Sequence, residues 1–262
     1  MDLKLQRKSV LIMAASKGLG KATALEFARE GAYVTIASRN PDNLLRARDD
    51  IERETGAAVT TVVADVASAA DIENAVRVAS ARTGGVDVLV TNAGGPPAGS
   101  FDMFDDQAWQ TAYENNLLSV IRLIRAALPS MRAGKSGRIV NLTSVSIKQP
   151  LNDLLLSNVF RAGVYALTKS LAAELGKDGI LINTVAPGRI ETERIVSLDR
   201  RTAEQAAVPV ETVRQKWLDQ IPLGRYGTPE EFAKTVVFLG SFANTYVTGQ
   251  ALLVDGGMVK AL

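Results

Sequence analysis

Short apolar runs alternate with segments of helical period along almost the whole chain. The runs have strand length, and the segments between them carry apolar residues three and four positions apart, which is typical of strands followed by helices. The expected strands are 10–14, 33–37, 59–63, 86–90, 138–142, 180–185 and 251–254. The expected helices are 19–30, one that begins at Pro41 behind the cap residue Asn40, 69–82, 106–131, 154–175 and 229–240. This alternation predicts a doubly wound α/β fold with a mostly parallel, seven-stranded sheet covered on both faces.

No linker, repeat or low-complexity stretch divides this pattern, so we expect residues 1–262 to form a single domain. The one irregular stretch is 193–220, which is charged and helix-prone. In a doubly wound sheet an insertion so late in the chain falls at the carboxyl ends of the strands, where ligands bind. We therefore expect 193–220 to be a substrate loop within the domain.

Composition removes several classes of function. The chain is 47% hydrophobic and 22% charged with a net charge of +2, which is typical of a globular protein without general attraction to nucleic acid or anionic membranes. The apolar stretch 10–15 is too short for a signal segment or a membrane span, so we expect a cytoplasmic protein. The chain has no cysteine and no histidine, which excludes disulfides, thiol catalysis and Ser-His-Asp triads.

A glycine-containing turn joins the first expected strand to the first helix. It reads Ala14-Ala15-Ser16-Lys17-Gly18-Leu19-Gly20. Glycines at such a turn let the backbone approach a pyrophosphate, and the helix N-terminus stabilises its charge. We expect cofactor contacts from Ser16, Lys17, Gly18, Leu19 and Gly20. Taken alone, the turn is also compatible with simple strand-to-helix packing.

Together with later motifs, this turn resembles that of the short-chain dehydrogenase/reductase family. The other matching motifs are Asp65-Val66, Thr91-Asn92-Ala93-Gly94, Trp109, Asn116-Leu117, Ser144, Pro187-Gly188-Arg189-Ile190-Glu191-Thr192, Gly224-Arg225 and Val254-Asp255-Gly256-Gly257. The resemblance spans 9–257 and is strongest toward 3-oxoacyl-carrier-protein reductases. It implies a Rossmann-type fold, a nicotinamide dinucleotide, a small-molecule carbonyl or alcohol substrate, and a homo-oligomer (tetramer or dimer).

The resemblance also assigns further cofactor contacts. Asp65 and Val66 bracket the adenine, and Ile190 and Thr192 contact the nicotinamide end. The remaining implied contacts are Asn92, Ala93, Gly94, Pro187 and Gly188. Met13 and Ala14 depart from the family's Thr and first Gly, and a Cβ at residue 14 costs about 1–2 kcal/mol if the turn needs a positive φ.

Two positions favour NADP over NAD. NAD-preferring enzymes place Asp or Glu at the end of the second strand to bind the ribose 2′-hydroxyl. Ser38 stands there, Arg39 follows, and Lys17 lies in the first turn. Two cations without a carboxylate suit a 2′-phosphate. The alternative is that Lys17 and Arg39 are solvated surface charges.

The catalytic positions of the family are only partly filled. Ser144 matches the Ser that polarises the substrate carbonyl, and Asn116 aligns with the Asn that holds a catalytic water. The family's Tyr lies thirteen residues after the Ser and its Lys four further on, but here those places hold Ser157 and Arg161. Lys148 could serve as a replacement acid if it were desolvated, or it could be a solvated loop charge.

A literal Tyr-x-x-x-Lys occurs at Tyr165 and Lys169, eight residues later than the family's pair. On a helix that offset is about 12 Å along the axis and roughly 80° in rotation. We expect these two residues to belong to the core or an interface.

Two functions remain open from the sequence. The first is an NADP(H)-dependent oxidoreductase for a carbonyl/alcohol pair, 3-oxoacyl reductase-like, with an altered catalytic set. The second is a catalytically inactive dinucleotide-binding protein that acts as a scaffold or sensor. Around the expected substrate loop, Arg189, Arg194, Arg200 and Arg201 only hint at an anionic substrate.

Overall fold

The computed structural model describes residues 1–261 and contains one seven-stranded sheet. Its strands are β1 Ser9–Met13, β2 Tyr33–Ser38, β3 Thr60–Val63, β4 Val88–Thr91, β5 Gly137–Leu142, β6 Ile180–Pro187 and β7 Ala251–Val254. They are ordered β3-β2-β1-β4-β5-β6-β7, and every neighbouring pair is parallel. The predicted doubly wound sheet is confirmed.

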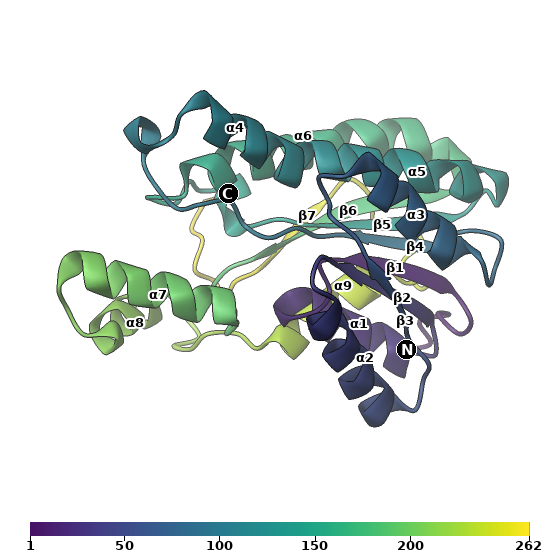
Figure 1. Ribbon diagram of the computed structural model, residues 1–262, viewed down its shortest axis with the longest axis horizontal. Coiled ribbons are helices and arrows are strands. Elements are labelled where there is room, and N and C mark those ends of the chain that lie inside the picture. Colours follow the sequence, from purple (N-terminus) through teal and green to yellow (C-terminus); the bar gives the residue numbers. More distant parts are fainter. Residues whose placement is uncertain (262) are drawn as a thin grey trace.

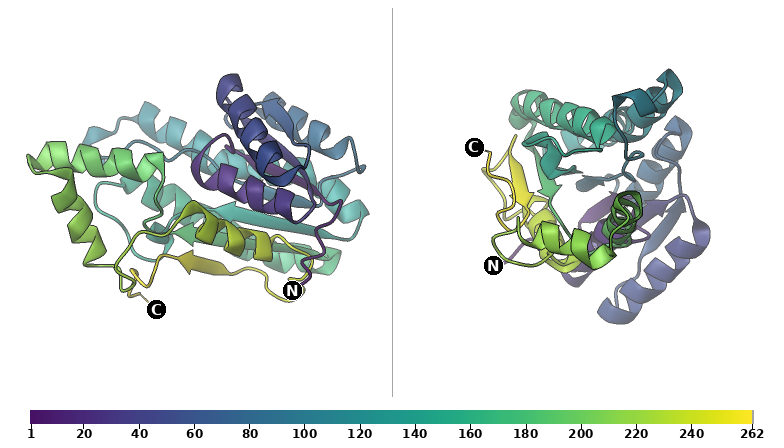
Figure 2. Two further views of the ribbon diagram at one scale, coloured as in Figure 1. Left: turned by 90° about the horizontal axis from the view of Figure 1, so that it is seen from below. Right: turned by 90° about the vertical axis from the view of Figure 1, so that its left-hand side faces the viewer.

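Helices cover both faces of this sheet (Figures 1 and 2). The helices are α1 Gly18–Arg29, α2 Pro41–Thr55, α3 Ala69–Ser80, α4 Asp106–Tyr113, α5 Ser119–Ala133, α6 Leu155–Leu175, α7 Glu193–Ala206, α8 Val210–Leu218 and α9 Pro229–Leu239. The helices α1, α2 and α9 pack on one face, and α3, α5 and α6 pack on the other. In the part of the chain described, no helix has both the length and the apolar character needed to cross a membrane.

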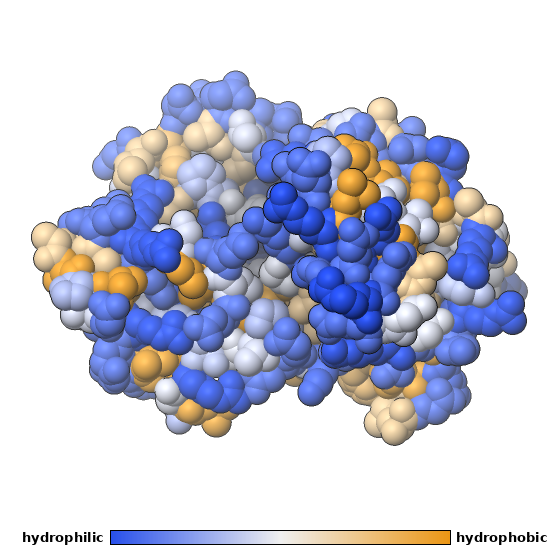
Figure 3. Space-filling model, turned by 60° about the horizontal axis from the view of Figure 1, so that its bottom comes forward, coloured by the Kyte–Doolittle hydropathy of each residue, from blue (hydrophilic) through white to orange (hydrophobic). Residues whose placement is uncertain are grey.

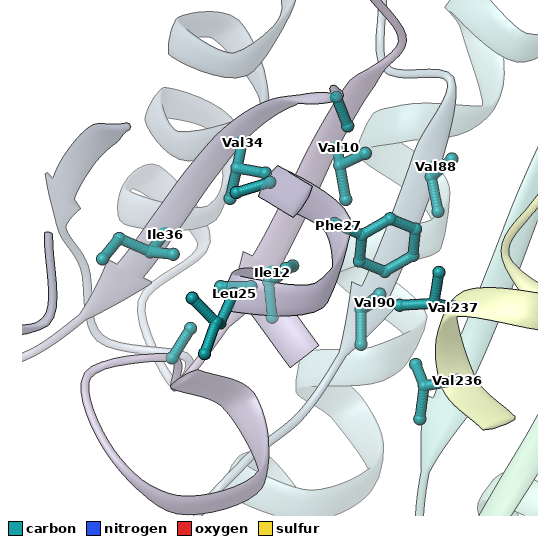
Figure 4. Packing of buried hydrophobic residues seen from close by; sticks show 14 of the residues in the cluster. Val10, Ile12, Leu25, Phe27, Val34, Ile36, Val88, Val90, Val236 and Val237 are labelled. Atoms are coloured by element: carbon teal, nitrogen blue, oxygen red, sulfur yellow. The ribbon is translucent and has the colours of Figure 1, made fainter. Parts of the chain in front are cut away.

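Successive side chains of the central strand β1 point to opposite faces of the sheet, which explains why helices pack on both faces. In β1, Val10 and Ile12 point into the cluster under α1 and α9, whereas Leu11 and Met13 point toward α3 and α5. All four are fully buried, as expected of a parallel strand covered on both sides. Figure 4 shows the α1 side, where the ring of Phe27 lies among valines of β4 and α9.

The sheet reverses its order between β1 and β4, which opens a crevice at the carboxyl ends of these strands. The turn after β1 and the loop after β4 lie side by side there. Their contact is held by Asn92, whose Nδ2 donates to the carbonyl oxygen of Ala14 at 3.2 Å. The fold therefore places two of the predicted cofactor segments together at the switch point.

Two expected elements differ from the prediction. The segment 106–131 is not one regular helix, because a π-helical turn, η2 Glu114–Leu118, separates α4 from α5. The segment 193–220 holds two helices, α7 and α8, which project from the end of the sheet at the left of Figure 1. Ala207 separates them in a left-handed conformation.

The packing under α1 predicts a large loss of stability on truncation of Phe27. Phe27 is 0% exposed, and removal of a buried aromatic ring typically costs about 3–5 kcal/mol of unfolding free energy. We expect Phe27→Ala to lose about this much in denaturant titration. Phe101→Ala is the matched control, because Phe101 is 70% exposed and should change stability by about 0.5 kcal/mol or less. Equal losses for the two variants would contradict the packing described here.

Candidate functional site

The turn after β1 is shaped by close packing of α1 against the strand end. A Cβ on Gly20 would lie 2.6 Å from the carbonyl oxygen of Ala14, so no side chain fits there. Ala14 and Gly18 adopt φ values of +48° and +52°, so the positive φ that was in question at residue 14 is present, and alanine bears its cost. The first residues of α1 have no side-chain cap, which leaves their N–H groups available to an anion.

A cavity of about 570 Å³ lies beside this turn. Of the predicted cofactor residues, it brings together Ser16, Lys17, Ser38, Arg39, Val66 and Gly94. Ala14, Ala64 and Asn116 also line it. A glycine turn at a helix N-terminus, beside an elongated wall from three strand ends, fits a dinucleotide.

Sequence reasoning missed one wall of this cavity. It is formed by Gly95, Pro96, Pro97, Asp105, Gln107, Ala108, Thr111, Ala112 and Asn115. These residues lie in the loop after β4 and along α4, and no motif distinguishes them. Their position after a strand that ends at the switch point is the only signal in the sequence.

The other predicted cofactor residues lie around the cavity. Asp65 folds onto its own loop, where its carboxylate accepts from the N–H of Ala67 at 3.0 Å. Thr192 caps α7 and lies close to the first turn, because a Cβ on Gly18 would be 3.6 Å from its methyl group. Pro187, Gly188 and Ile190 lead from β6 toward that cap.

The end of β2 is cationic. Ser38 shares a 2.9 Å hydrogen bond with the hydroxyl of Ser16. Arg39 is exposed and forms no ion pair within residues 1–261, while Lys17 pairs with Glu193 at 3.0 Å across exposed surface. The side chains that would meet the 2′ position of an adenosine ribose are therefore a hydroxyl and two cations.

Asn116 lies inside the π-helical turn and is 1% exposed. Its Nδ2 donates to the carbonyl oxygen of Ala112 at 3.1 Å, and its buried Oδ1 has no partner in the described chain. Buried polar atoms are normally paired, so this oxygen fits a bound water.

Ser144 lies at the end of β5, half-buried, and caps a short 3₁₀ turn, η3 Val145–Ile147. Its Oγ accepts from the N–H of Ser146 at 3.2 Å, which leaves the hydroxyl proton for another acceptor. Lys148 follows on the same turn and is exposed. The apolar surroundings that the replacement-acid hypothesis needs are not present there.

Ser157 and Arg161 lie one turn apart on α6. Ser157 is half-buried, and Arg161 is 5% exposed. The guanidinium of Arg161 donates to the carbonyl oxygens of Leu142 at 2.8 Å and Ala93 at 3.1 Å, so it ties the end of β5 to the loop after β4. Burial, with a smaller effect of Arg194, lowers the pKa of Arg161 to about 10.

The face of α6 that meets the sheet carries Arg161, Val164 and Thr168. Thr168 accepts from Asn141 of β5 at 2.9 Å. Tyr165 is half-buried on the flank of this face, and the Nζ of the exposed Lys169 lies 5.8 Å from its ring. Neither residue lines the cavity, and neither do Ser144, Ser157 and Arg161, so the core or interface role of Tyr165 and Lys169 stays a prediction.

Ionisable groups in the cavity wall offer little acid–base chemistry. They are Lys17, Arg39 and Asp105, and Asp105 caps α4 by accepting from the N–H of Ala108 at 2.8 Å. Within residues 1–261, no three His, Cys, Asp or Glu side chains form a metal-binding group. The site can bind and orient ligands, but its wall has no tyrosine to donate a proton.

A buried ion pair holds α7 and α8 beside the strand ends. Arg189 pairs with Asp199 at 2.9 Å and stacks over Trp217, 3.6 Å from the ring centroid. Tyr226 donates to the other oxygen of Asp199 at 2.9 Å; burial and this hydrogen bond raise the pKa of Tyr226 to about 12.

Seen from below, most of the molecular surface is hydrophilic, with apolar residues in separate small patches (Figure 3).

Known proteins share both this sequence pattern and this geometry. Residues 13–259 match the family model described as enoyl-(acyl carrier protein) reductase. The 3-oxoacyl-[acyl-carrier-protein] reductase of Thermotoga maritima is 34% identical over 260 residues, covering 98% of this chain and 100% of that one. Its counterpart from Chlamydia muridarum is 31% identical over 258 residues, with the same coverage.

Solved structures of similar proteins lead to the same family. L-sorbose reductase from Gluconobacter frateurii, complexed with NADPH and L-sorbose, superposes with a TM-score of 0.94 at 33% identity, with both chains fully covered. A 7α-hydroxysteroid dehydrogenase complexed with NADH has a TM-score of 0.90 at 31% identity and covers 100% of this chain and 98% of its own. A glycine turn at the switch point, its adjoining cavity and these full-length matches show that the chain belongs to the short-chain dehydrogenase/reductase family of NAD(P)-dependent oxidoreductases.

Proposed function

We propose that this protein is an NADP(H)-dependent oxidoreductase that interconverts a carbonyl and an alcohol, 3-oxoacyl reductase-like, with an altered catalytic set. The observation that carries the cofactor choice is the end of β2, where Ser38 and Arg39 replace an acidic residue at the cavity wall. Lys17 adds a second cation. The relatives with NADPH or with 3-oxoacyl substrates support this choice.

The chain's own residues would hold the cofactor along the cavity. The N-terminus of α1 faces the diphosphate, with Gly18 and Gly20 permitting its close approach. Arg39 and Lys17 bind the 2′-phosphate, and Val66 and Gly94 lie along the cavity toward the rest of the dinucleotide. When bound, the nicotinamide supplies or accepts the hydride.

Ser144 would polarise the substrate carbonyl with its free hydroxyl proton, and the unpartnered oxygen of Asn116 would hold a water. Ser157 has no adjacent base and is a poor acid. Arg161, bound to two carbonyl oxygens, orders the strand ends and keeps its proton. The product oxygen must then take its proton from solvent through the water at Asn116, and loss of a positioned acid typically costs about 10²–10⁴ in rate.

The alternative is a dinucleotide-binding protein without turnover. It is favoured by one specific observation, the engagement of Arg161 with backbone carbonyls in place of the family's Lys. The homo-oligomer and the cytoplasmic location remain predictions for either function.

We expect NADPH to bind more tightly than NADH, because Arg39 and Lys17 complement the 2′-phosphate. Arg39→Asp should change the ratio of the two dissociation constants by more than about tenfold in favour of NADH. Fluorescence titration of both cofactors measures this. Arg46→Asp is the control, since Arg46 is exposed on α2 and does not line the cavity. An unchanged ratio in Arg39→Asp would make Arg39 a solvated surface charge.

The double change Ser157→Tyr with Arg161→Lys should restore the family's acid and the cation that lowers its pKa. Carbonyl reduction measured by NADPH consumption should rise by about 10²-fold or more. Ser157→Tyr alone should gain less, because a phenol without a nearby Lys keeps a pKa near about 10. Lost activity in the double variant would show that Ser157 and Arg161 already work in a rebuilt site. Intact NADPH binding with no turnover before or after would favour the inactive alternative.

Tyr165→Phe should leave any reductase rate within about threefold, because eight residues of helix place its ring about 12 Å along α6 from residue 157. Steady-state rates and a thermal melt of the same sample test this together. A hundredfold loss in a folded variant would mean that Tyr165 is the proton donor after all.

A further inference from the structure

Arg161 is a buried cation whose charge is not neutralised within residues 1–261. Its two hydrogen bonds end on carbonyl oxygens, those of Leu142 and Ala93. It forms no ion pair in the described chain. A buried charge normally requires an opposite charge or full hydrogen bonding. Arg161 therefore has unused capacity for an anion.

Two other buried arginines show how the same fold satisfies such a charge. Arg138 donates to four carbonyl groups and packs over the ring of Phe242, 4.6 Å from its centroid. Arg189 pairs with the carboxylate of Asp199 at 2.9 Å. Arg161 lacks the many carbonyl acceptors of Arg138 and the carboxylate partner of Arg189. It therefore differs from the two arginines that serve the fold alone.

A second guanidinium, from α7, reaches the same short segment. Arg194, in the first turn of α7, donates to the carbonyl oxygen of Pro96 at 2.9 Å. Arg161 holds Ala93 and Arg194 holds Pro96, so the two arginines bracket the glycines between them. A Cβ on Gly95 would lie 2.9 Å from the NH2 group of Arg194, whereas the space beside Gly94 is open. These two glycines line the cavity.

Three acids at the start of α7 and within its first two turns are already paired with other cations. Their pairs are Glu191 with Arg214, Glu193 with Lys17, and Asp199 with Arg189. Arg194 has no carboxylate partner in the described residues, and the positive charge of Arg194 helps to lower the pKa of Arg161. Two cations without a counterion, bound to carbonyl oxygens only three residues apart in the chain, attract an anionic ligand.

We propose that Arg161 and Arg194 bind the carboxylate of an oxo-acid substrate across the gap at Gly94 and Gly95. The inference rests on the proposed oxidoreductase function and narrows its substrates from carbonyl compounds in general to anionic ones. Guanidinium groups match a planar carboxylate with paired hydrogen bonds. Phosphate oxygens of the cofactor share this chemistry, so the experiment must separate the two sources.

Helical geometry supplies a matched control on α7. Arg194 and Arg201 lie seven residues apart and share one stripe of the helix, while Arg200 falls on a different face. Arg200 lines a separate hollow with Val196 and Ser197. Arg194→Gln and Arg200→Gln therefore remove the same charge from two faces of one helix, and both residues are exposed enough for the variants to fold.

Calorimetric titration of the full chain with acetoacetate and with its neutral methyl ester, in the presence and absence of NADP⁺, tests the proposal. The unaltered protein should bind acetoacetate at least tenfold more tightly than the ester. Arg194→Gln should weaken acetoacetate at least tenfold and leave the ester unchanged, and Arg200→Gln should behave as the unaltered protein. Gly95→Ala, which keeps both charges but displaces the Arg194 guanidinium, should weaken acetoacetate to an intermediate degree.

A separate NADPH titration of the same variants keeps this test distinct from that of the proposed function. NADPH affinity should be the same in Arg194→Gln, in Arg200→Gln and in the unaltered protein. A protein that binds no NADPH refutes the proposed oxidoreductase, whereas the acetoacetate titration without NADP⁺ decides the anion site by itself. If Arg194→Gln instead weakens NADPH and leaves acetoacetate binding unchanged, the guanidinium serves the cofactor diphosphate and the proposal is overturned. Equal binding of acid and ester by the unaltered protein, or binding of neither, also overturns it.

Discussion

The other parts of the site depend on the close packing of α1 against the end of β1. The start of α1 lies against the end of β1 so tightly that residue 20 has no room for a Cβ. This contact brings a helix N-terminus to the point where the sheet reverses its order, and it forces the chain at Ala14 into a left-handed conformation. The carbonyl of Ala14 is then available to Asn92, which draws in the loop after β4. The cavity is the space that these three segments leave between them.

Charge is distributed unevenly around that space. On the α7 side, carboxylates pair with arginine or lysine side chains, and one of these pairs is buried. At the end of β2, Arg39 faces the cavity without an acidic partner among residues 1–261. A cavity with this balance concentrates anions by electrostatics alone, and a dinucleotide phosphate and a substrate carboxylate would both benefit. Such a cavity therefore favours a pair of ligands, cofactor and substrate, that each carry a negative charge.

The sequence predicted the sheet well because parallel strands covered on both faces are continuous apolar runs. Boundaries were displaced by one or two residues, as at β1, which begins at Ser9, and at β6, where Ala186 and Pro187 continue the pairing with β7. The first turn and the β2 end were predictable from glycines and charges near one another in the chain. The contacts of Arg161 were not, since its acceptors at Ala93 and Leu142 are distant in sequence and the reach of a side chain has no sequence signal. The alignment placed Arg161 on the helix face that meets the sheet, but its two carbonyl partners had no signal in the sequence.

The π-helical turn between α4 and α5 changes the rotation of one helix relative to the other. A regular helix converts each added residue into about 100° of rotation, but a wide turn absorbs one residue locally. The faces of α4 and α5 are thereby decoupled, so that α4 can present Ala108 and Thr111 to the cavity while α5 keeps Leu123 and Ile124 against the sheet. Within this widened turn, the side-chain amide of Asn116 donates a hydrogen bond to the carbonyl oxygen of Ala112. A single residue of extra length thus lets the wall of the site and the core of the fold vary independently of each other.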